Sequence, residues 1–251
     1  DGIAELWFDS VEDETALKGV KRNVQQAVSD ILKANQQDDH GGPVRLPSAE
    51  RGPSSASTSQ RSASEEFIEA VLIAQITRVI SSPQYPLGHL RQNKLVYFAH
   101  RRADENVGQF FLKKAAGPYS PWATYRGPET IAQKNGYVKK AKVGSFVGFV
   151  VGDSIDRIDR YLSHYPVCAA VDWVASKLRF KKNEELELLA TIDFAALDLI
   201  EQGVPITMEN VKHIIENDQE WKPKLQRGSF SDANITRALA ELQTLFPATY
   251  A

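Results

Sequence analysis

Apolar side chains recur at three- and four-residue steps through most of the chain, which predicts a protein built mainly of helices. In the second part of the chain this spacing predicts helices over residues 65–80, 87–106, 128–135, 155–165, 167–178 and 186–200. Ser62-x-x-Glu65 has the form of a capping box and is expected to begin the first of them. Two further helices are expected after Thr207 and Ser231, whose hydroxyls suit the N-cap position.

Residues 136–142 and 145–151 depart from the helical pattern. The first stretch is half polar, the second is apolar and β-branched, and they meet at Val143–Gly144. This arrangement predicts a small β-hairpin. Helices around one hairpin suggest a winged-helix-like element, so the expected fold is mainly α with one small β-hairpin.

The expected domain organisation has three parts. Residues 1–37 contain an amphipathic helix in which Leu17, Val20, Val24 and Ile31 share one face. Residues 38–61 are rich in Gly, Pro and Ser and nearly lack large apolar residues, which predicts a flexible linker. Residues 62–251 form the main helical domain. The chain begins with Asp, so residues 1–37 are expected to be the tail of an upstream region of a longer protein.

Composition narrows the function classes. The 251 residues carry a net charge of −2, so no global basic field indicates nucleic-acid binding. The single cysteine, Cys168, excludes an internal disulfide and a cysteine-based zinc site, and it fits a reducing, cytoplasmic compartment. No apolar run has the length of a membrane span. Glycine-rich nucleotide loops and zinc or serine hydrolase motifs are missing, so neither a cofactor nor catalysis is expected.

Three groups of residues offer alternative chemistry. His164 and Cys168 lie four residues apart and could activate a thiolate, although a buried core cysteine is the favoured interpretation. Asp153, Asp156 and Asp159 could hold a metal, but a solvated acidic helix start explains them better. His100, with the two arginines that follow it, could contact phosphate or end a helix in solvent.

The segment 113–129 interleaves aromatic and cationic side chains, a pattern that can stack bases and neutralise phosphates. The simpler interpretation is that its aromatic rings fill the core beneath a turn. Lys139, Lys140 and Lys142 on the expected hairpin would extend a basic surface. The candidate contact residues for a partner or nucleic acid are Arg101, Arg102, Lys113, Lys114, Tyr119, Trp122, Arg126, Lys139 and Lys140.

Several segments resemble a known family. QNKLVYFAHRR (Gln92–Arg102) is similar to the KLLYFAH signature of Panacea or SocA-like antitoxin domains, and AAGPYSPW (Ala115–Trp122) stands where that family has a G-P turn. ELELLATIDFAA (Glu185–Ala196) and the spacing of Trp221, Lys224, Phe230 and Ile235-x-x-Ala238-Leu239 add to the likeness. Together they resemble the C-terminal domain of DarG-type antitoxins over about Glu65–Phe246. Similar domains are appended to restriction–modification proteins.

The resemblance implies a non-catalytic interaction module of a bacterial defence or toxin–antitoxin system. Its partner would be a cognate protein, either a toxin or a restriction–modification subunit. The family's ADP-ribose-removing activity belongs to a separate macrodomain, for which 61 residues are too few, so that activity is not expected here. A protein-binding module predicts an exposed apolar or acidic patch. Asp193, Asp198 and 184–187 are candidates for the acidic one, although a solvated helix face is the favoured interpretation of these carboxylates. The alternative is a DNA-binding module that uses the hairpin and the 113–126 loop.

Overall fold

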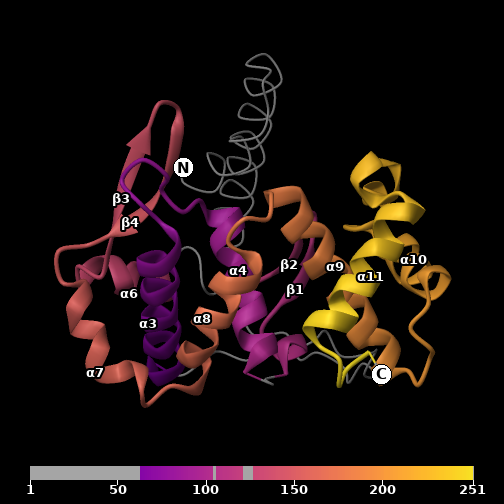
Figure 1. Ribbon diagram of the computed structural model, residues 1–251, viewed down its shortest axis with the longest axis horizontal. Coiled ribbons are helices and arrows are strands. Elements are labelled where there is room, and N and C mark those ends of the chain that lie inside the picture. The colour runs from indigo at the N-terminus through magenta and orange to yellow at the C-terminus, as the bar shows by residue number, and fades with distance from the viewer. Residues whose placement is uncertain (1–62, 104–105, 121–126, 251) are drawn as a thin grey trace, which may run out of the picture. The chain divides into compact units, whose positions relative to one another are not determined.

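The computed structural model describes residues 63–103, 106–120 and 127–250 (Figure 1). Among these residues are eight α-helices and two antiparallel two-stranded hairpins, which confirms the mainly α fold class. They belong to a unit that spans Gln60–Ala251. The predicted helix in 1–37, the linker 38–61 and the Ser62 cap lie outside the described residues.

The helices follow one another through the whole unit. They are α3 (Ala63–Ile80), α4 (His89–Arg102), α6 (Pro128–Lys134), α7 (Asp159–Leu162), α8 (Pro166–Leu178), α9 (Asn183–Glu201), α10 (Met208–Asn217) and α11 (Asp232–Leu245). The strands are β1 (Leu112–Lys114), β2 (Gly117–Tyr119), β3 (Val138–Val143) and β4 (Phe146–Val151). Short 3-10 turns lie at Val107–Gln109, Ile155–Ile158, Lys222–Gln226 and Gly228–Phe230.

Two central helices, α4 and α9, organise the core. Ten of the fourteen α4 residues are buried, including the run Gln92–Arg101, because this helix is covered by α3, α8, α9 and β2. Helix α9 carries α10 and α11 on its other sides. Tyr97 of α4 meets the edge of Phe111 at 5.2 Å between ring centroids, and Phe98 stacks on Phe246. Buried polar side chains of α4 such as Lys94 and Arg101 have partners on β2 and α9, which allows this helix to be enclosed on most of its sides.

The two hairpins lie in different parts of the unit. The predicted hairpin is present as β3 and β4, paired from Val138↔Val151 to Val143↔Phe146 and contacting α3 and α6. The second, β1–β2, was not predicted because strands of three residues are too short to show an alternating pattern. It packs on α4 and α9 and requires Gly117, whose φ is +90°. A Cβ there would lie 2.7 Å from Thr191 Oγ1.

Some boundaries differ from the sequence prediction. The helix expected over 155–165 is divided into a 3-10 turn and the single turn α7, and Pro166 begins α8. Thr207 caps α10 as predicted, since its hydroxyl accepts the Asn210 N–H at 3.2 Å. Ser231 occupies the N-cap position of α11, but the predicted capping bond from its side chain is absent. In the described ranges, every helix is too short or too polar to cross a bilayer.

Candidate functional site

The two arginines predicted for partner contact at the end of α4 have different surroundings. The buried Arg101 guanidinium donates to both carboxylate oxygens of Asp193, at 2.7 Å from Nε and 3.1 Å from Nη2. Arg102 is exposed, and its guanidinium lies 5.4 Å from the centre of the Trp173 ring. Arg101 therefore joins α4 to α9 inside the core, whereas Arg102 remains at the surface.

Lys113 and Lys114 lie on strand β1, and both are paired. Lys113 Nζ is 2.6 Å from an Asp198 carboxylate oxygen and 5.2 Å from the centre of the Trp221 ring. Lys114 Nζ is 3.2 Å from a Glu220 carboxylate oxygen, and its carbonyl accepts the indole N–H of Trp221 at 2.9 Å. These contacts fasten the β1–β2 hairpin to the second half of the unit.

Lys139 and Lys140 lie on β3, whose main contacts are with β4 and α6. The β1–β2 hairpin, by contrast, packs on α4 and α9. Both lysines are exposed, and Lys139 Nζ is 2.7 Å from an Asp153 carboxylate oxygen. Tyr119 is half-buried on β2, and Trp122 and Arg126 lie outside the described residues. The described candidates are thus divided between the core, the surface of α4 at Arg102, the β1–β2 hairpin and the β3–β4 hairpin.

Asp193 is the centre of a buried polar network that the sequence did not reveal. Its carboxylate accepts hydrogen bonds from Tyr97 Oη at 2.6 Å and Tyr250 Oη at 3.0 Å, besides the two from Arg101. Burial, with the adjacent carboxylate, raises the pKa of Tyr97 and of Tyr250 well above 10. Both phenols therefore remain donors, and the buried charge has its hydrogen bonds satisfied.

A second buried cluster surrounds Lys94. Its ammonium is fully enclosed and donates to the Pro118 carbonyl at 2.6 Å. Burial, then repulsion from Lys224, lowers the pKa of Lys94 from 10.5 to about 7, and the carboxylate of Glu187 opposes this change. Glu187 also accepts from Lys224, and Arg227 donates to its two oxygens at 2.7 and 3.1 Å. This cluster holds β2, α9 and the 222–230 segment together.

These contacts determine which carboxylates of the expected acidic patch are exposed and which are buried or paired. Asp193 and Glu187 are buried and paired with cations, and Asp198 is paired with Lys113. Glu184 and Glu185 are exposed at the start of α9. Most of the carboxylates proposed for a surface patch are therefore used inside the fold.

The catalytic alternatives have simple surroundings. Cys168 is buried in α8, whereas His164 is exposed in the turn before that helix. Asp153 pairs with Lys139, and Asp159 pairs with Arg78 at 2.6 Å. Within the described ranges, no three His, Cys, Asp or Glu side chains converge as a metal ion would require. His100, proposed for phosphate, is buried with Nε2 2.8 Å from a Glu69 carboxylate oxygen.

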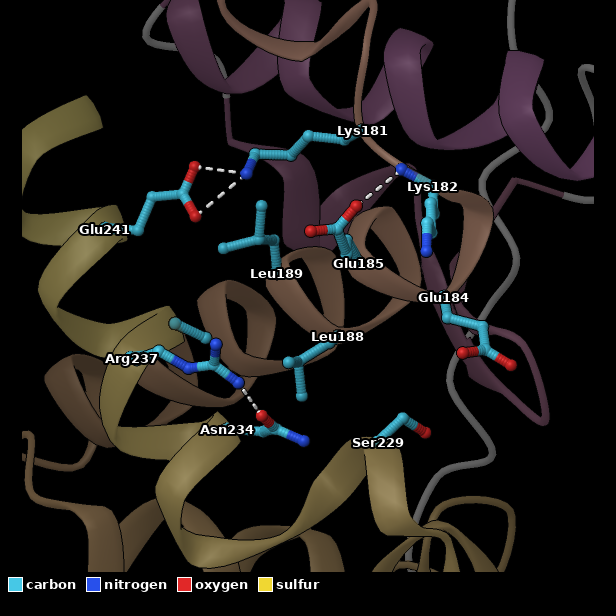
Figure 2. Close-up of a pocket in the computed structure, with 11 residues that line it drawn as sticks. Lys181, Lys182, Glu184, Glu185, Leu188, Leu189, Ser229, Asn234, Arg237 and Glu241 are labelled. Atoms are coloured by element: carbon cyan, nitrogen blue, oxygen red, sulfur yellow. Dashed lines mark hydrogen bonds and ion pairs between the residues drawn. The ribbon is translucent and has the colours of Figure 1, made fainter.

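A hollow of about 310 Å³ lies between the start of α9 and α11 (Figure 2). Part of its polar lining is paired internally: Lys181 Nζ lies 2.7 Å from a Glu241 oxygen, and Glu185 accepts the Lys182 backbone N–H at 2.7 Å. Figure 2 shows the Lys181–Glu241 ion pair above Leu189. This ion pair uses part of the charge that the hollow could offer to a small polar ligand.

A larger hollow, of about 910 Å³, is bordered by the Val107–Gln109 turn, β1 and the end of α9. Arg101 and Lys113 contribute its cations, and each is paired with an aspartate, Asp193 and Asp198 respectively. Its apolar rim includes the exposed Leu112 and Ile200. Substituting these two exposed apolar rim residues provides a control for substitutions of exposed apolar side chains elsewhere on the unit.

Large apolar side chains are exposed on three segments that each contact Leu87–Arg91, around the start of α4. Tyr85 and Phe180 are 80% and 91% exposed, and Phe146 at the β3–β4 turn is 49% exposed. We call this surface the apolar end and define it by Tyr85, Leu90, Val143, Phe146, Val147 and Phe180. These residues lie on the α3–α4 connection, the start of α4, the tip of the β3–β4 hairpin and the α8–α9 loop, which are all in the upper half of Figure 1.

Specific contacts hold these three segments at the same end. Phe146 lies directly on Gly88, where a Cβ would come within 2.7 Å of the ring, and the Leu87 backbone pairs with Phe149. Arg91 of α4 donates to the carbonyls of Arg179 and Lys181, on either side of Phe180. The apolar end is therefore positioned by backbone-directed bonds as well as by packing.

Sequence reasoning missed the apolar end. The run from Phe146 to Val151 is almost wholly apolar, which is typical of a strand buried on both faces, yet only its middle is buried. Phe180 stands alone between cationic residues, which is the one local signal that it is exposed.

Compared with known proteins, the chain matches no family model and no curated protein.

Proposed function

We propose that this unit is a non-catalytic protein-binding module of a bacterial defence or toxin–antitoxin system, and that it binds and neutralises or regulates a cognate protein. The observation that supports this most is the apolar end. Side chains such as Tyr85 and Phe180 gain about 1.5–3 kcal/mol each when they are fully buried, and the half-exposed Phe146 gains less. Aromatic side chains that are exposed in one region are typical anchors of protein interfaces.

The placement of the unusual titratable groups also supports binding over catalysis. Lys94 and Tyr97, whose pKa values shift strongly, line neither of the two hollows described above. A general acid or base must reach a substrate within hydrogen-bonding distance. The structural role of these groups in joining α4 to β2 and α9 is sufficient to explain their burial.

DNA binding is the second candidate, because Lys134, Lys139, Lys140 and Lys142 gather at α6 and β3. The helix before the hairpin has seven residues, three of them buried, and offers little surface to a DNA groove. Mobility shifts with duplex DNA at about 50 and about 200 mM salt test this candidate, since phosphate contacts weaken steeply with salt.

A growth assay tests the protein-binding function. The chain is co-expressed with the product of a neighbouring gene that arrests growth, and rescue is scored. We expect the double variant Tyr85→Ser/Phe180→Ser to lose rescue and co-purification, because it removes two highly exposed anchors without disturbing the core.

The matched control is Leu112→Ser/Ile200→Ser, which removes two residues of 43% and 45% exposure at the larger hollow. This control should rescue growth like the wild type. Circular dichroism of both purified variants establishes that each one is folded. Full rescue by a folded Tyr85→Ser/Phe180→Ser protein would refute the apolar end as the docking surface.

A further inference from the structure

Among the described residues, the outer edge of strand β3 pairs with no other strand. The direction of its backbone N–H and C=O groups follows from the pairing of β3 with β4. Leu87 exchanges both backbone hydrogen bonds with Phe149, at 2.8 and 2.9 Å, so the N–H and C=O of Phe149 point away from β3. Lys140 lies directly opposite Phe149. Lys140 and Phe149 are therefore a non-hydrogen-bonded pair, in which both residues direct their backbone N–H and C=O groups away from the partner strand. Hydrogen-bonded and non-hydrogen-bonded pairs alternate along an antiparallel ladder, so Lys142 and Val147 form the next non-hydrogen-bonded pair. Lys140 and Lys142 therefore present N–H and C=O groups at the outer edge of β3.

This edge is accessible along most of its length. Lys139, Lys140, Lys142 and Val143 are exposed, and Ala141 is half-buried. In the part of the chain that the structure describes, no further strand pairs with β3. The tip of the hairpin extends past the neighbouring helices α3 and α6 in Figure 1.

The edge is also strongly basic. Lys134, at the end of α6, adds to the three lysines of β3, and Asp153 is the carboxylate paired with Lys139. Among the described residues, Lys140 and Lys142 have neither a hydrogen-bond nor an ion-pair partner for their ammonium groups. This local excess contrasts with the net charge of −2 of the whole chain. An incoming strand with carboxylates would meet a complementary surface.

The lysines argue against a second copy of this chain as the occupant. Lysine on an edge strand discourages pairing with an identical edge, because like charges would then face one another. The same charges favour a strand of opposite sign. The lysines that disfavour self-association are therefore the same ones that would attract an acidic partner.

The apolar residues at the turn favour a polypeptide over a nucleic acid. By the two-residue repeat of a strand, Lys142 and its partner Val147 share one face of the hairpin, and Val143 and Phe146 share the other. All three apolar side chains are exposed. A phosphate backbone offers these side chains nothing to bury, whereas a peptide with alternating acidic and apolar residues matches both the charge and the apolar contacts.

We propose that the outer edge of β3 binds an extended acidic segment of the partner protein by strand addition. This proposal rests on the protein-binding function proposed above and names the chemistry of the partner at the hairpin. Main-chain hydrogen bonds to Lys140 and Lys142 supply the pairing, alternate carboxylates meet these lysines on one face, and apolar residues on the other face contact Val143.

A displayed library of random peptides, each long enough for one strand of about six residues, tests this directly on the full chain. We expect the selected peptides to alternate Asp or Glu with apolar residues. Lys140→Glu/Lys142→Glu should weaken their binding at least about ten-fold by fluorescence anisotropy. The control Lys177→Glu/Lys222→Glu makes the same charge change at exposed positions on α8 and the 222–226 turn and should change binding less than about two-fold.

A backbone-blocked peptide separates strand addition from simple charge attraction. Methylating the peptide nitrogens that face Lys140 and Lys142 removes the N–H donors and should abolish binding, whereas methylating the alternate nitrogens should not. Absence of enriched peptides, enrichment without an acidic bias, or binding indifferent to methylation each overturns the proposal. Displacement of the peptides by low concentrations of duplex DNA also overturns it and favours the nucleic-acid alternative.

The outcome is independent of the growth assay for the apolar end. If Tyr85→Ser/Phe180→Ser loses rescue while the peptide experiment fails, the unit binds its partner without strand addition. If rescue survives that substitution, the partner docks elsewhere than at the apolar end. If the wild-type chain neither rescues growth nor co-purifies with the partner, the protein-binding function itself fails.

Discussion

Replacing Lys94 with methionine tests whether its enclosed amine limits the stability of the fold. Methionine has a similar length and no charge, so it fills the same space beneath β2. The substitution loses the hydrogen bond to the Pro118 carbonyl, which contributes about 1 kcal/mol at every pH. It also removes the cost of burying an ammonium group, and that cost depends on pH.

The sign follows from proton binding. The pKa of Lys94 is about 7 in the folded protein, whereas an exposed lysine in the unfolded chain has a pKa of about 10.4. Between these values the unfolded chain holds a proton that the folded protein has released, so stability rises with pH. Linkage gives a rise of about 3 kcal/mol in the free energy of unfolding between about pH 7 and about pH 9.5. Burial lowers the pKa of Lys224 in the same direction, which adds to the wild-type slope.

Urea unfolding of the wild type and Lys94→Met at several pH values measures this difference. We expect the wild type to gain about 3 kcal/mol relative to the variant as the pH rises from about 7 to about 9.5. Lys177→Met, at an exposed site on α8, should follow the wild-type curve. The raised pKa values of Tyr97 and Tyr250 act only above about pH 10 and lie outside this window. Parallel curves for Lys94→Met and the wild type would refute a lowered pKa in the folded state.

Two further substitutions test the interior by urea or thermal unfolding. Asp193→Leu should lose about 3–5 kcal/mol because it leaves Arg101 buried without a counter-charge, and adding Arg101→Leu should recover at least half of that loss; a double variant no more stable than the single one would contradict this. Gly117→Ala should cost about 2–3 kcal/mol, because φ is +90° and the new Cβ meets Thr191, whereas Gly144→Ala, with open space around it, should cost about 1 kcal/mol. Equal losses for the two glycines would remove the steric argument.

The sequence alone determined the helical class of the protein and most helix positions. Periodicity is a local property, so the spacing of apolar residues predicted α3, α8, α9 and α10, and the polar-then-apolar segments around Gly144 predicted the β3–β4 hairpin. Thr207 as a cap followed from the same local chemistry. Each of these predictions depends on residues within a few positions of one another.

Only the tertiary structure determined which charged residues are buried and which face solvent. Arg101 and His100 end a helix in the sequence and could equally have faced solvent, but the approach of α9 and α3 encloses them against Asp193 and Glu69. Arg101 and Asp193 are 92 residues apart, so no local pattern joins them. The apolar end likewise depends on Arg91 and Gly88 bringing three separate loops together. Whether a side chain is a core residue or a contact residue depends on which elements cover it, and the chain's local pattern does not contain that information.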